Sequence, residues 1–187
     1  MDIKLLSNPE QIRAKFLERF VLSWEAFQLE YQDWISQLAE RNYPIGIEWY
    51  EQSFLWGRMR KDLPIVSMKE ALAVLREHKG AVRFLSEGPS CCAERRLLLR
   101  DQKYVGFAAE AKPEELADLI EEEWFESYRL AMEDRYNPCP VLPEELYVFD
   151  ESMEWCVVFT HETTDWESEL DDPMKAAESR LCFVCRI

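Results

Sequence analysis

Glycine and histidine are scarce in this chain, which has five glycines and two histidines among 187 residues. The glycines are scattered and form neither a nucleotide phosphate-binding loop nor a dinucleotide fingerprint. The zincin pattern needs two histidines on one helix, whereas His78 and His161 are far apart in the sequence. We therefore expect neither a catalytic motif of these types nor a cofactor.

The sequence also lacks any apolar run of 18 residues, so no membrane-spanning helix is expected. The first ten residues, MDIKLLSNPE, do not have the basic and apolar regions of a signal peptide. A net charge of −15 disfavours anionic lipid surfaces and general nucleic-acid binding. These observations predict a soluble cytoplasmic protein with neither membrane nor direct nucleic-acid contacts.

Six cysteines are present, and without a secretory signal we expect reduced thiols. Cys182 and Cys185 have the C-x-x-C spacing of a zinc knuckle. The residues between them favour a strand, however, and positions three apart in a strand face opposite sides of the sheet. Cys91 and Cys92 are adjacent, which is poor geometry for chelation. Buried free thiols and no metal site are therefore predicted.

Basic residues are nearly absent from residues 110–172, which contain 21 acidic side chains but only Lys112, Arg129 and Arg135. This region therefore has a net charge of −18, whereas the other 124 residues together have a charge of +3. Such asymmetry is informative about partners rather than about fold. It indicates either a cationic partner or imitation of a polyanion.

Large apolar residues recur every three or four positions after Pro9, which predicts a long N-terminal helix with one apolar stripe. A break near Leu22-Ser23 is compatible with this pattern. The aromatic residues of this apolar stripe are expected to pack against the protein's own core. The stripe consists of Ile12, Phe16, Phe20, Trp24, Phe27, Tyr31, Trp34 or Ile35, and Leu38.

Two further helices are predicted, one after the capping box formed by Ser67 and Glu70 and one beginning at Pro113. Alternation and β-branched content predict strands between and after them. We expect an α+β fold with a mixed, mainly antiparallel sheet. The chain 1–187 is interpreted as one domain, with a helical segment at 1–42 and the sheet with its helices at 67–187. The main predicted strands are 54–59, 81–86, 145–149, 155–160 and 180–186.

His161 is the most interesting titratable residue because it follows a predicted central strand. Together with Glu162 and Asp165 it has the donor types of a metal site or an acid–base pair. The simpler interpretation is a strand-end histidine that is hydrogen-bonded to a neighbouring carboxylate.

The strongest functional signal is a mixture of acidic and aromatic residues in the C-terminal part. Acidic groups accelerate encounter with a basic partner, and buried aromatic area supplies affinity. The predicted partner-binding residues are Asp150, Glu151, Glu154, Trp155, Glu162, Asp165, Trp166, Glu167 and Glu169.

Residues 142–150 (LPEELYVFD) and 155–162 (WCVVFTHE) resemble the C-terminal strand pair of small bacterial cytosolic proteins. Some of those proteins are similar to immunity proteins of toxin–immunity systems, and the resemblance implies a one-to-one protein complex without a cofactor. The leading hypothesis is a non-enzymatic acidic protein that binds a basic partner such as a toxin. The alternatives are a small metal-dependent hydrolase that uses His161, Glu162 and Asp165, and a nucleic-acid mimic formed by the acidic face of the helix at 113–134.

Overall fold

A seven-stranded antiparallel sheet organises the computed structural model, which describes residues 3–60, 62–87, 108–132, 142, 145–163 and 179–187. The strand order is β1-β4-β3-β5-β6-β7-β2, and every pairing between neighbours is antiparallel. The strands are β1 (Lys4–Leu5), β2 (Ile65–Val66), β3 (Val82–Glu87), β4 (Ala108–Ala111), β5 (Glu145–Phe149), β6 (Trp155–Thr163) and β7 (Arg180–Arg186). The predicted α+β class is confirmed.

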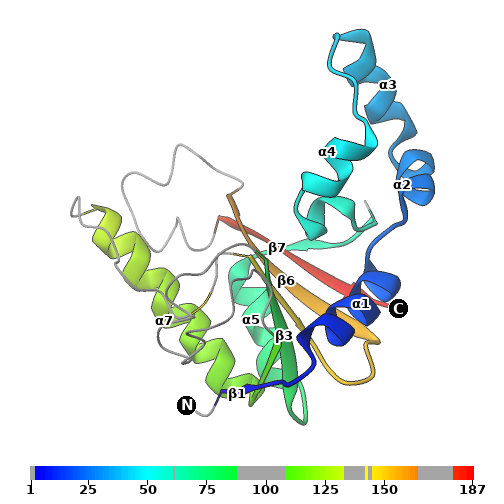
Figure 1. Ribbon diagram of the computed structural model, residues 1–187. Helices are drawn as coiled ribbons and strands as arrows, with labels where there is room; N and C mark the ends of the chain where they lie inside the picture. The colour runs from blue at the N-terminus through cyan, green and yellow to red at the C-terminus, as the bar shows by residue number, and fades with distance from the viewer. Residues whose placement is uncertain (1–2, 61, 88–107, 133–141, 143–144, 164–178) are drawn as a thin grey trace.

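Helices cover both faces of this sheet (Figure 1). On one face α5 (Met68–Glu77) and α7 (Pro113–Met132) bury residues such as Leu72 and Leu116 against β3, β5 and β6. On the other face α1 (Pro9–Phe20) buries Phe16 against Tyr147 and Phe149. The central strands are apolar on both sides because both sides are covered.

The N-terminal helical segment is present, and it is divided at the expected place. Backbone from Val21 to Ser23 leaves the helix, after which α2 (Trp24–Glu30) and α3 (Gln32–Glu40) follow. Ser23 caps α2 by accepting a hydrogen bond from the Ala26 amide at 3.2 Å. With α4 (Ile47–Gln52), these helices form a projection, residues 24–52, which we call the helical arm (Figure 1).

The helical arm departs from the prediction that the whole aromatic stripe is core. Phe27 is fully buried among Trp24, Tyr31, Trp49 and Tyr50, but α3 and α4 bury none of their residues within the described structure. Helical periodicity places residues on one face but does not provide a second surface to cover it. In this protein the helical arm projects beyond the sheet, so the sheet does not cover the last part of the apolar stripe (Figure 1).

The strand predicted at 54–59 is wrong, since η1 (Leu55–Arg58) is a short 3₁₀ helix. Leu55 and Met59 are both buried, but a spacing of four puts two residues on one face of either a helical turn or a strand, so this pattern could not distinguish the two. The capping box is confirmed: Ser67 and Glu70 exchange hydrogen bonds at the start of α5. Gly80, after the helix, has a φ of 106°, a conformation that glycine adopts readily.

Candidate functional site

The predicted acidic surface is divided between the two ends of the β5–β6 hairpin. Asp150, Glu151 and Glu154 lie at its turn, since Phe149 pairs with Cys156. Glu162 lies at the opposite end of β6, seven residues after Trp155, which is a separation of about 23 Å along a strand. Asp165, Trp166, Glu167 and Glu169 lie outside the described residues.

At the turn, two of the acids make intramolecular contacts. Asp150 accepts hydrogen bonds from the Ser152 hydroxyl at 2.6 Å and the Met153 amide at 3.0 Å. Burial opposes ionisation of Asp150, but these hydrogen bonds hold its pKa below the ordinary value. Glu151 accepts from Arg83 at 3.0 Å while its side chain remains 85% exposed. These contacts give both acids a structural role.

Trp155 also differs from the exposed anchor that the sequence suggested. Its ring lies 4.6 Å from that of His78 and packs against the core beneath α5 and α7. His78 ends α5, and its Nε2 lies 3.9 Å from Asp150. His78 therefore has a structural role, since it connects the end of α5 to the hairpin turn.

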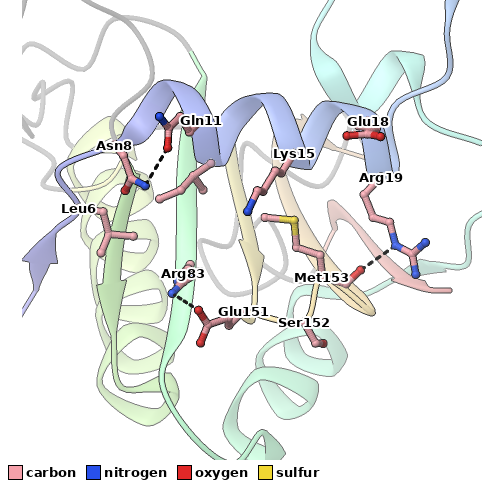
Figure 2. A pocket seen from close by; sticks show the side chains of 11 residues that line it. Leu6, Asn8, Gln11, Lys15, Glu18, Arg19, Arg83, Glu151, Ser152 and Met153 are labelled. Carbon is pink, nitrogen blue, oxygen red and sulfur yellow. Dashed lines mark hydrogen bonds and ion pairs between the residues drawn. The ribbon is translucent and has the colours of Figure 1, made fainter.

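A hollow of about 550 Å³ lies between α1 and the hairpin turn (Figure 2). It is lined by charges of both signs, including Lys15, Arg19, Glu18, Arg83 and Glu151. Arg19 donates to the Met153 carbonyl at 3.2 Å, and Arg83 is paired with Glu151. Because the carboxylates of Glu18 and Glu151 lie among the three basic side chains that line it, the hollow does not present a concentrated positive charge.

The acidic face of α7 is partly paired in the same way. Arg76 of α5 lies 2.8 Å from Asp118 and 2.6 Å from Glu121, and Lys112 lies 2.8 Å from Glu115. Exposed pairs of this type contribute little to stability. They do reduce the net negative charge that a nucleic-acid mimic would present there.

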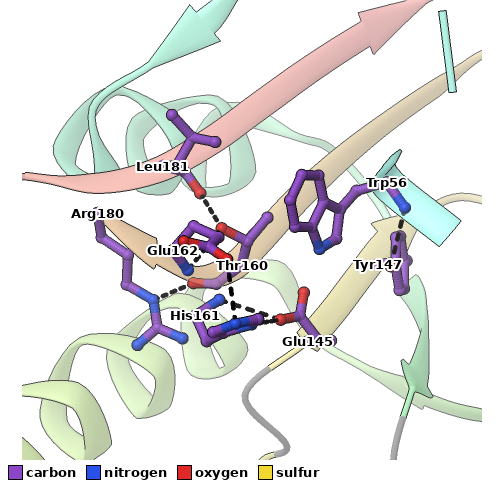
Figure 3. Close-up of polar contacts among 8 residues, drawn as sticks. All are labelled: Trp56, Glu145, Tyr147, Thr160, His161, Glu162, Arg180 and Leu181. Atoms are coloured by element: carbon purple, nitrogen blue, oxygen red, sulfur yellow. Dashed lines mark hydrogen bonds and ion pairs between the residues drawn. The ribbon is translucent and has the colours of Figure 1, made fainter. Parts of the chain in front are cut away.

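At the other end of the hairpin, His161 lies between two carboxylates (Figure 3). Its Nδ1 contacts Glu145, which also accepts from the His161 amide at 3.2 Å, and its Nε2 lies 3.3 Å from Glu162. Burial raises the pKa of Glu145, although the hydrogen bonds from His161 counteract part of this effect. The predicted hydrogen bond between His161 and a neighbouring carboxylate is confirmed, but Glu145 was not among the predicted site residues.

Glu162 also lines an apolar groove of about 830 Å³ between the sheet and the helical arm. We call it the aromatic groove. Its rings come from Tyr31, Trp34 and Trp49 of the arm, Phe54 and Trp56 at η1, and Phe183 of β7. Its volume falls in the range of pockets that bind small molecules or side chains. Phe54 connects the groove to His161 and its two carboxylates, because the ring of Phe54 lies 5.1 Å from that of His161.

The three cysteines of the described strands are free and buried. Cys182 packs in the core beneath α5 and α7, whereas Cys185 packs in the core beneath α1, as the strand geometry predicted. Burial raises the pKa of Cys182 to about 12. Within the described residues, no cluster of three or more histidine, cysteine or acidic side chains could hold a metal ion.

No protein-family model matches this chain, and no curated protein or solved structure is significantly similar to it. A search for membrane spans among the described residues finds no helix that is both long and apolar enough to cross a bilayer.

Proposed function

We propose that this protein is a non-enzymatic binding protein that engages a basic protein partner in the cytoplasm. The observation that carries the proposal is the aromatic groove, whose rings are accessible beside the carboxylate of Glu162. Trp34 is 39% exposed and Phe54 41% exposed, and aromatic side chains of this kind are typical anchors of protein interfaces. A toxin neutralised by its immunity protein, as the sequence resemblance implies, is one partner of this type.

Net charge supports the same proposal. A charge of −15 accelerates encounter with a cationic surface over long distances. The acids of the hairpin turn contribute to this field, although Asp150 and Glu151 have intramolecular partners. We therefore assign the direct contacts to the aromatic groove and Glu162.

Affinity capture with the purified chain as bait tests this function. From a lysate of the cells that produce this chain, we expect the bait to recover one basic protein in stoichiometric amount. A bait with the double substitution Trp34→Ala and Glu162→Gln should not recover it. Glu77→Gln is the matched charge control, since this exposed acid ends α5 on the opposite face of the sheet from the groove and its loss removes the same charge. Recovery of no stable partner at either low or physiological salt would refute the proposal.

An enzyme that uses His161 is the second candidate, and one observation favours it. A buried carboxylate on Nδ1 orients an imidazole in the way that general bases require. Asp165, the third member of the predicted set, lies outside the described residues. Metal analysis and ester hydrolysis by the purified protein test this candidate, and activity that His161→Gln abolishes would favour it over the binding protein.

A further inference from the structure

The two walls of the aromatic groove come from different parts of the chain. Trp34 of α3 lies 5.5 Å from Trp49 of α4 on the arm side. On the sheet side, the ring of Trp56 stacks with that of Phe54, at 6.2 Å, and with that of Phe183, at 6.1 Å. An occupant of the groove therefore meets π faces and ring edges from both walls.

Aromatic rings of this molecule already accept a cation. The guanidinium of Arg58 lies over the ring of Tyr50 with its central carbon 5.0 Å from the ring centroid. The negative face of an aromatic ring attracts cations, most strongly in tryptophan. The groove contains three tryptophans, so it offers a partner cation stronger π faces than the tyrosine offers Arg58.

The charges around the groove also favour a cation. Among the described residues that line it, the one cation, Arg60, donates two hydrogen bonds to Asp62, at 3.0 and 2.7 Å. Burial raises the pKa of Tyr31 to about 12, and the negative charges of Glu30 and Asp62 act in the same direction. The groove-lining carboxylate, Glu162, is 38% exposed and accessible to a cationic head group.

We propose that the aromatic groove binds one lysine or arginine side chain of the basic partner. The aliphatic stem lies against the rings of Trp34, Trp49 and Trp56, and the cationic head pairs with Glu162. This inference rests on the proposed function, because the partner supplies the side chain. In this arrangement the groove supplies the affinity, and the remaining acidic residues accelerate the encounter with the partner.

A titration with amino-acid amides tests the site directly. The probes are Nα-acetyl-lysine amide, Nα-acetyl-arginine amide and the uncharged Nα-acetyl-norleucine amide, followed by the indole N–H signals in NMR spectra. We expect the two cationic probes to bind at least about tenfold more tightly than norleucine, with shifts at Trp34 and Trp49. Equal binding of norleucine would show a merely apolar pocket and would overturn the proposal.

Variants separate the site from the general field of the protein. Glu162→Gln should remove most of the preference for the cationic probes, whereas Glu77→Gln, which changes the net charge equally at the end of α5, should preserve it. Trp34→Ala should weaken the binding of all three probes. Unchanged NMR signals from the other residues of the helical arm would show that the fold of this variant is intact. If the partner is captured but the probes show no cation preference, this inference fails and the proposed function stands. If no partner is captured either, both fail.

Discussion

The sheet and the helical arm use aromatic side chains in opposite ways. Under α1, Phe16 is fully buried and its ring contacts those of Phe20, Tyr147 and Phe149. In the arm, Trp34 and Tyr43 remain exposed, and Phe27 is surrounded mainly by other aromatic rings. The first arrangement stabilises the fold, whereas the second leaves apolar area available to a partner.

The largest effect should follow truncation of the buried ring. Phe16→Ala should lower the free energy of unfolding by about 3–5 kcal/mol, because a fully enclosed aromatic side chain leaves a cavity. Urea unfolding of the wild type and the variant measures the difference. If Trp34→Ala, at the exposed position, lowered the free energy of unfolding by as much, the contrast between the two regions would be contradicted.

A pH-dependent effect should follow from Glu145. Its pKa in the folded protein is raised above the ordinary value of 4.5, so between these two values the folded state binds more protons than the unfolded state. Stability from this group is therefore present below pH 4.5 and is lost as the pH rises through the folded pKa. A tenfold difference in proton affinity between the two states corresponds to about 1.4 kcal/mol.

Glu145→Gln removes this titration while keeping an oxygen that can accept from His161. Urea unfolding from about pH 4 to about pH 8 should show the wild type losing stability relative to the variant as the pH rises. If the difference in unfolding free energy between wild type and variant stays constant over this pH range, the pKa of Glu145 is the same in the folded and unfolded states.

The sequence predicted much of the fold but less of the candidate site. Capping and periodicity identified α5 and α7, and local composition identified β5, β6 and β7, because these signals depend on neighbours along the chain. The contact between Glu145 and His161 spans 16 residues and needs the register that pairs Leu146 with Phe159. The aromatic groove needs three separate segments to meet, and no local pattern encodes that meeting.

A smaller effect is expected at the start of α5. Ser67→Ala should cost about 1 kcal/mol, because the Glu70 amide loses its hydrogen-bond acceptor at the helix start. Thermal unfolding followed by circular dichroism measures it. Ser67→Asp is the matched control, since its carboxylate can accept the same hydrogen bond, and an alanine variant as stable as this control would show that the cap contributes nothing.

The smallest effect should occur at Leu29, the most exposed large apolar side chain of the arm at 76%. Leu29→Ser should change the free energy of unfolding by no more than about 0.5 kcal/mol, because little apolar area leaves water when the isolated chain folds. Urea unfolding at two protein concentrations tests this. A clear loss that grows with concentration would mean that a second copy covers the arm, since binding to the folded state adds to its apparent stability. In that case the exposed arm would be an interface between copies of this chain, and its apolar surface would not be available to a different partner.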